Sequence, residues 1–130
     1  MPDYDKIGPC CQKIEDMMRY ASDVIDHWPP YHKYTDGEEI RRQMLLLLRL
    51  ATKARLRYYN KTTLSELDTE KEVLKAFIRA ANATVFSDKK GQRRRLLSDH
   101  SFGVWSEKIN EIGKLIGGWI QTVSKSHTKE

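Results

Sequence analysis

The densest cluster of chemically active side chains lies between residues 41 and 61, which carry seven basic residues and no acidic one. This stretch is also rich in leucine and in residues that favour helix, so we expect one helix with a buried apolar side and an exposed cationic side. A surface with charge of one sign is suited to an anionic partner. The candidate contacts on this helix are Arg41, Arg42, Arg49, Lys53, Arg55 and Arg57.

On a helical wheel, the cationic side of this segment holds Arg42, Arg49, Lys53 and Arg57. The apolar side predicts a core face made of Ile40, Met44, Leu47, Ala51, Ala54 and Tyr58. Three leucines lie outside that face, namely Leu45, Leu46 and Leu50. They indicate burial on a second side, either in a subunit interface or under a neighbouring helix of the same chain, and the sequence leaves both open. Arg55 falls nearer the core side, where it would extend outward along its stem or pair with an acidic residue.

The scaffold for these residues is predicted to be helical, with apolar spacing that places helices at about 9–27, 36–59, 64–86 and 102–124. Two consecutive prolines end the first helix, and capping boxes that begin at Thr35 and Thr63 are expected to open the next two. Ser101 is the expected cap of the last helix. Four helices with short links and no credible strand predict an all-α, up-and-down four-helix bundle, with residues 1–130 in a single domain.

The third and fourth predicted helices and the loop between them carry further signals. Lys71, Lys75 and Arg79 form a second cationic row, whose positive charge is partly offset by neighbouring glutamates.

Residues 87–101 predict a basic loop, and such charge runs are usually solvated connectors. Three glycines in the fourth helix, Gly113, Gly117 and Gly118, predict the close approach of a neighbouring helix. That helix is expected to be core throughout, and residues 125–130 to be a frayed tail.

The composition and the charge limit the classes of protein to which this chain can belong. The net charge is +5 over 130 residues, and acidic residues crowd the first third of the chain. We expect a cytoplasmic protein, because the sequence has neither a membrane-spanning run nor a signal peptide. Cys10 and Cys11 are adjacent, which disfavours a relaxed disulfide, so they are expected to be packing or surface thiols. The histidines are scattered without partners, and we expect no catalytic site, no metal and no cofactor.

Two segments carry a family resemblance. Tyr34-Thr35-Asp36-Gly37-Glu38-Glu39-Ile40-Arg41 opens the leucine-rich helix, and Glu111-Ile112-Gly113-Lys114-Leu115-Ile116-Gly117-Gly118-Trp119-Ile120 lies in the last helix. Together with the lysine-rich third helix, they resemble the accessory variability determinant (Avd) family of diversity-generating retroelements. The resemblance extends from about residue 28 to residue 123, and it places the chain in a wider group of small four-helix bundles. That group includes the ribosomal RNA intervening-sequence proteins.

The resemblance implies a barrel-shaped homopentamer with a strongly positive surface. It also implies a non-catalytic protein that associates with the retroelement's reverse transcriptase and template RNA and supports mutagenic cDNA synthesis. On this basis the basic residues of both rows would neutralise phosphates, and RNA–DNA hybrid or single-stranded DNA are further possible ligands. Tyr58 and Tyr59 could stack on unpaired bases, although tyrosine at helical spacing is more often core. The alternative is an intervening-sequence type of bundle with no retroelement role.

Overall fold

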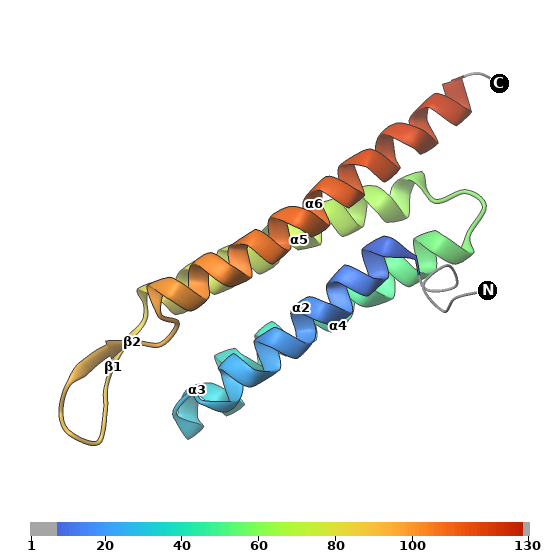
Figure 1. Cartoon of the computed structure of the whole chain (residues 1–130). Helices are drawn as coiled ribbons and strands as arrows, with labels where there is room; N and C mark the ends of the chain where they lie inside the picture. The colour runs from blue at the N-terminus through green and yellow to red at the C-terminus, as the bar shows by residue number, and fades with distance from the viewer. Residues whose placement is uncertain (1–7, 129–130) are drawn as a thin grey trace.

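The computed structural model describes residues 8–128, and within them the chain forms a bundle of long helices (Figure 1). The long helices are α2 (Pro9–Asp26), α4 (Asp36–Leu56), α5 (Lys61–Ala83) and α6 (Asp99–Thr128). A short helix, α3 (Pro30–Tyr34), and two short strands, β1 (Val85–Ser87) and β2 (Arg93–Arg95), lie at one end of the bundle. The predicted all-α helical bundle is therefore confirmed, with a small hairpin added.

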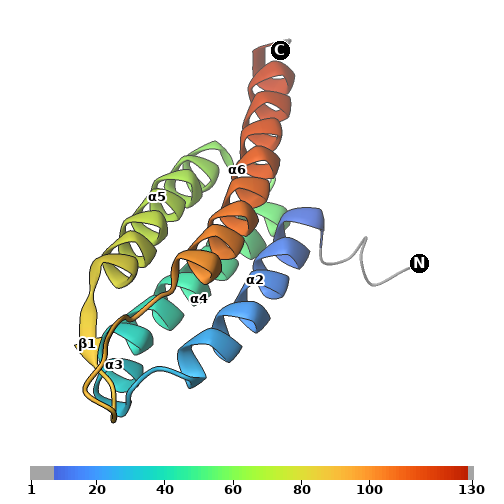
Figure 2. The ribbon, with the colours of Figure 1, turned by 60° about the vertical axis from the view of Figure 1, so that its left-hand side comes forward.

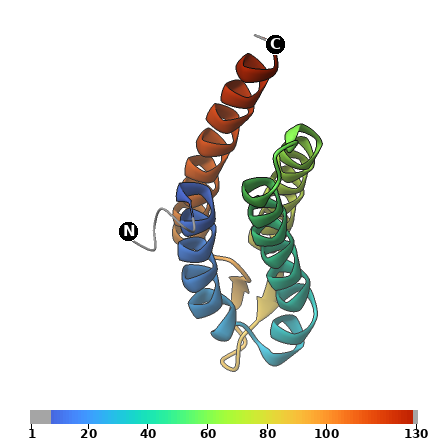
Figure 3. The ribbon, with the colours of Figure 1, turned by 90° about the vertical axis from the view of Figure 1, so that its right-hand side faces the viewer.

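The long helices form a closed ring in which each one packs against the next along the chain, and α6 returns to pack against α2. Figure 3 shows α2 and α6 on one side and α4 and α5 on the other. The core between them is made of apolar residues at helical spacing, including Ile14, Met17, Leu47, Leu64, Leu67, Leu74, Ile78, Trp105 and Ile109. This burial stabilises the bundle and fixes which side of each helix faces outward.

Helix α4 buries most of the predicted core face, but it ends earlier than expected. Ile40, Met44 and Leu47 are buried, whereas Tyr58 is 79% exposed, so its predicted place in the core is wrong. The reason is local: Arg57 adopts an extended backbone, and the side chain of Asn60 donates a hydrogen bond to the carbonyl of Ala54. That buried contact closes the end of α4, and Asn60 then becomes the residue from which α5 begins.

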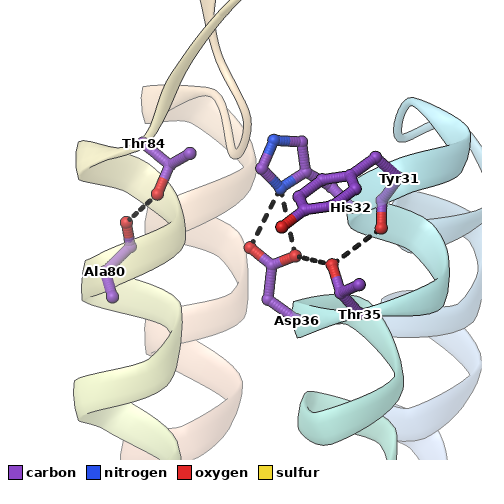
Figure 4. Close-up of polar contacts among 6 residues, drawn as sticks. All are labelled: Tyr31, His32, Thr35, Asp36, Ala80 and Thr84. Carbon is purple, nitrogen blue, oxygen red and sulfur yellow. Dashed lines mark hydrogen bonds and ion pairs between the residues drawn. The ribbon is translucent and has the colours of Figure 1, made fainter.

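Neither predicted capping box forms. The Thr35 hydroxyl donates to the Tyr31 carbonyl and to the Asp36 carboxylate, so it does not cap the backbone of α4 (Figure 4). Thr63 lies inside α5, since that helix starts at Lys61. At the start of α6, it is Ser98 rather than Ser101 that acts as the cap, because its hydroxyl accepts the Ser101 backbone N–H at 3.1 Å.

The predicted basic loop and the predicted end of the third helix are both partly wrong. Helix α5 stops at Ala83, and an antiparallel hairpin follows in which Val85 pairs with Arg95 and Ser87 with Arg93. Residues 88–91 form its turn, with Gly91 in the left-handed region at φ 78°. Asp at the first turn position and Gly at the fourth suit a type I turn followed by a glycine bulge.

The C-terminal half of α6 projects past the other helices (Figure 2). Ile109, Ile112 and Ile116 are fully buried, but Trp119 and Ile120 are only half-buried, so the helix is not core throughout. The predicted role of the glycines also changes, because a Cβ at Gly113 would meet the Lys71 side chain and a Cβ at Gly117 or Gly118 would meet open space. Among the described residues, no helix is both long enough and apolar enough to cross a membrane.

Candidate functional site

The predicted cations of α4 divide into an outward group and an inward group. Arg42, Arg49 and Lys53 are exposed on one side of the helix, which we call the α4 outer face. Arg42 forms an ion pair with Glu39 at 2.8 Å, but both partners are well exposed, and such pairs contribute little. Arg49 and Lys53 make no ion pair with any described residue. Two of the three cations on the α4 outer face therefore carry charge that no ion pair with a described residue neutralises.

Arg41 has a structural role instead. Its guanidinium donates to the Asp26 carboxylate at 3.0 Å and to the Ser22 hydroxyl at 3.3 Å, and its side chain is only 29% exposed. Both partners belong to α2, so Arg41 joins α2 to α4. It is consequently a poor candidate for contacting an external anion.

Arg55, in the last turn of α4, and Arg57, just after that helix, also make contacts within the chain. Arg55 is exposed, yet its side chain lies beside Gly8, where an added Cβ would stand 3.2 Å from Arg55 Cδ. It lines an apolar hollow of about 290 Å³ together with Cys10, Leu115 and Trp119. Arg57 donates to the Thr63 hydroxyl at 3.2 Å. Arg55 is therefore an exposed residue at the edge of this hollow and not part of the core.

The second cationic row, on α5, is only partly available. Lys71 is 12% exposed and lies 2.9 Å from Asp68. Burial alone would lower the pKa of Lys71, but its hydrogen bond to Asp68 and the charges of Asp68 and Glu72 outweigh burial and raise it. Lys75 pairs with Glu72 at 3.6 Å, and Arg79 is exposed without an ion pair among the described residues.

The two rows do not merge into one surface. Lys71 and Lys75 line a shallow hollow of about 370 Å³ whose opposite wall is α6, with Gly113 and Lys114. The α4 outer face instead points away from the other helices, because the buried residues of α4 occupy its opposite side. Of the nine predicted site residues, the structure thus places three on the exposed α4 outer face and two, Lys71 and Lys75, in a more neutralised α5–α6 groove.

Aromatic and cationic residues outside the predicted site are also exposed. Tyr58 and Tyr59 are 79% and 76% exposed, and their rings meet edge to face with centroids 4.7 Å apart. The hairpin adds five basic residues between positions 89 and 95. The turn signal in Asp88 and Gly91 was available from the sequence, but strands of three residues carry no apolar alternation that would reveal them.

The polar cluster in Figure 4 does not form a catalytic arrangement. His32 Nδ1 lies 3.0 Å from the Asp36 carboxylate, and Thr35 donates to that same carboxylate. Because the carboxylate stands between them, the histidine is not placed to take the threonine's proton. The cluster ties α3 to α4. Across the described part of the chain, no group of three or more His, Cys, Asp or Glu side chains is gathered as a metal site would require.

The two cysteines are buried and unbridged, as expected for packing thiols. Burial raises the pKa of Cys10 to about 12, with a smaller contribution from neighbouring Cys11. Burial also raises the pKa of Cys11, despite the hydrogen bond to Thr52 and the nearby Arg55 charge. A thiol held in its protonated form is a weak nucleophile, so neither cysteine is suited to covalent catalysis.

A match to a known protein family extends over almost the whole bundle. Residues 10–123 match the bAvd-like family, a span that runs from the first turn of α2 into the projecting part of α6. No curated protein matches the chain, and no solved structure does. Since the family match extends over most of the sequence, the chain belongs to the bAvd-like family, a family of accessory, non-catalytic proteins.

Proposed function

We propose that this protein is the accessory subunit of a diversity-generating retroelement, which binds the reverse transcriptase and template RNA and supports mutagenic cDNA synthesis without catalysing it. The observation that carries the proposal is the family match over residues 10–123. The exposed cations of the α4 outer face, two of which form no ion pair with a described residue, support it. Such a role is carried out in the cytoplasm.

RNA binding in this proposal is electrostatic. Arg49 and Lys53 are exposed and have no ion pair among the described residues, and Arg42 has only a solvent-screened one. Each cation that meets a phosphate releases a counterion, so affinity falls steeply as salt rises. Because contacts to phosphates carry no sequence information, we expect little sequence preference from the protein.

The proposed assembly is a homopentamer, and exposed apolar residues support an oligomer. Leu50 is buried within the chain, which assigns it to packing under a neighbouring helix. Leu45 and Leu56 remain 54% and 74% exposed, and Trp119 lies half-buried on the projecting part of α6. A subunit contact would remove these residues from water.

The test of the RNA surface is the triple variant Arg42→Ala, Arg49→Ala and Lys53→Ala. We expect its affinity for template RNA to fall about 10- to 100-fold at moderate salt, with the salt slope reduced by about two to three, since each lost phosphate contact removes about 0.7 to 0.9 from that slope. Fluorescence anisotropy with labelled RNA measures both quantities. A matched control replaces Lys13, Arg19 and Lys125, which are exposed cations outside the α4 outer face.

The outcome that contradicts the proposal is an α4 variant that binds RNA with unchanged affinity and unchanged salt slope. Equal losses in the α4 variant and the control would also contradict it, because they would show an effect of net charge rather than of this face. Circular dichroism and the thermal midpoint should be the same for all three proteins, since every replaced side chain is exposed.

A further inference from the structure

We propose that Tyr58 and Tyr59, at the corner between α4 and α5, form a platform on which the unpaired bases of a single-stranded nucleic acid stack. The phosphates of that strand would lie along the α4 outer face. The inference therefore rests on the proposed RNA surface and adds to it the class of nucleic acid that the surface takes. It is tested separately, because stacking on a ring does not depend on charge.

The corner exposes an unusual amount of apolar surface. Tyr58 is 79% exposed, Tyr59 is 76% exposed, and Leu56 just before them is 74% exposed. In the part of the chain that the structure describes, seven large apolar side chains are exposed, and three of them fall within these four consecutive positions. Exposed apolar side chains that gather in this way mark a binding surface.

The backbone on both sides of the tyrosines is anchored to the bundle. Asn60 is buried, its side chain donates to the Ala54 carbonyl at 2.8 Å, and its carbonyl accepts the Leu64 backbone N–H at 2.9 Å. Before the tyrosines, the Arg57 backbone N–H donates to the Lys53 carbonyl at 3.0 Å. The platform is therefore preorganised, which lowers the conformational entropy lost when a ligand binds.

The two rings leave faces available for stacking. Their centroids are 4.7 Å apart and their planes are inclined at 85°, so the edge of one ring lies against the face of the other. In this arrangement the partner ring covers a face of only one of the two rings. Every base has a flat face of its own, and base–aromatic stacking supports the binding of single strands of any sequence.

The charges around the corner favour a nucleic acid over a protein partner. Residues 40–65 contain seven basic side chains and no acidic one. Lys53 and Lys61 lie on either side of the tyrosines, are exposed, and form no ion pair with any described residue. Proteins that hold single strands combine such cations, which follow the backbone, with aromatic rings for the bases. A duplex keeps its bases stacked on one another, so the platform selects unpaired bases.

Exposed rings at the opposite end of the bundle have different neighbours. Tyr31 and Tyr34 of α3 are 73% and 71% exposed, and the basic hairpin lies at the same end (Figure 1). Lys33, between these tyrosines, lies 3.8 Å from Asp26. The residues that follow them form the acidic first turn of α4, with Asp36, Glu38 and Glu39. These carboxylates repel phosphates, so the α3 tyrosines match those of the corner in type and exposure but not in charge.

The experiment compares the corner variant, Tyr58→Ala and Tyr59→Ala, with the matched control Tyr31→Ala and Tyr34→Ala. The probes are a labelled poly-uridine strand and a blunt RNA duplex of the same length. We expect the corner variant to bind the single strand about 10- to 100-fold more weakly, because it loses base–aromatic stacking. Its salt slope should stay unchanged, since a lost stack involves no counterion. Its duplex affinity, and both affinities of the control, should change by less than about threefold.

The conservative variant Tyr58→Phe and Tyr59→Phe keeps both rings and should keep single-strand affinity. Four outcomes would overturn the inference: an unchanged corner variant, equal losses on strand and duplex, equal losses in the control, or an equal loss in the phenylalanine variant. Light scattering supplies a further check. A corner variant that assembles into a smaller oligomer would show that the tyrosines belong to a subunit contact, which would also overturn the inference.

The α4 variant, measured in parallel on both probes, separates this inference from the proposed function. A loss of affinity and salt slope confined to the α4 variant would uphold the proposed RNA surface and overturn the stacking platform. A loss of single-strand affinity confined to the corner variant would uphold the platform and overturn the α4 surface.

Discussion

The Arg94 guanidinium lies 2.6 Å from the Asp88 carboxylate, across the turn that joins β1 to β2. Apart from Asp88, every charged residue of this hairpin is basic. The hydrogen bond from Arg94 and those from the Gln92 and Lys90 backbone hold the pKa of Asp88 below its ordinary value. One acidic residue thereby organises a hairpin whose other charges are all positive and repel one another.

Replacing Asp88 with alanine should loosen the turn while leaving the bundle intact. We expect faster amide hydrogen exchange at Lys90 and Gln92, which lose their acceptor, and an unchanged thermal midpoint for the helices. Asp88→Asn, which keeps an acceptor oxygen but loses the charge, should give a smaller effect. Because the lowered pKa favours the carboxylate, the turn is stabilised at neutral pH and loses this contribution as pH falls through that pKa. Exchange rates that are the same in both variants and the parent protein would contradict the assigned role.

Gly37 is predicted to be intolerant of a side chain. A Cβ there would stand 2.9 Å from the His32 carbonyl oxygen and 2.9 Å from Ile25 Cγ2, so α3 and α4 would have to separate. We expect Gly37→Ala to reduce the free energy of unfolding by about 1–3 kcal/mol, as overpacking does. Gly103→Ala is the matched control, since a Cβ there meets nothing within 4 Å. Urea denaturation of both variants tests the contact, and equal stabilities would show that it is absent.

Gly117 in the projecting part of α6 should behave in the opposite way. A Cβ there meets no atom of the chain within 4 Å, and alanine favours helix over glycine by about 0.5–1 kcal/mol. We therefore expect Gly117→Ala to raise the free energy of unfolding by about that amount. Thermal unfolding combined with light scattering measures stability and assembly together. A destabilised variant that also dissociates would show that the glycine faces another subunit instead.

Thiol ionisation should make stability fall at alkaline pH. The folded protein holds the Cys10 proton up to a pKa of about 12, whereas the ordinary thiol value is 9.0. Because the folded state binds this proton more tightly, its contribution is complete below the ordinary pKa and is lost as pH rises toward the raised one. Urea denaturation as a function of pH should show this decline, and Cys10→Ala should reduce it. A decline of equal slope in both proteins would assign it to other groups.

The sequence was sufficient to predict the bundle because its core residues recur at helical spacing. Ile40, Met44 and Leu47 were placed correctly for this reason. Tyr58 was not, since the end of α4 is decided by the Asn60 side chain reaching back to Ala54, a contact that periodicity does not encode. The hairpin was missed because its strands are three residues long and mostly charged.

The candidate site could be predicted only as a set of charges. By residue type alone, Arg41 and Arg49 are equally good candidates for binding an anion. The Arg41 guanidinium, however, is hydrogen-bonded to Asp26, fifteen positions away on α2. Lys71 is likewise covered by α6 across from Gly113. Such pairings depend on how the helices are arranged in space. The structure therefore decides which of the predicted cations remain free to meet an external partner.

The central claim is association with a reverse transcriptase, and co-purification tests it most directly. The protein would be purified together with the reverse transcriptase encoded nearest to it, with and without nuclease, and the mass of the complex read by light scattering. We predict a complex of one polymerase with a pentamer of this chain, and the nuclease-treated sample would show how far RNA contributes to it. A pentamer that does not bind the polymerase under either condition would contradict the account and favour a four-helix bundle of the intervening-sequence type.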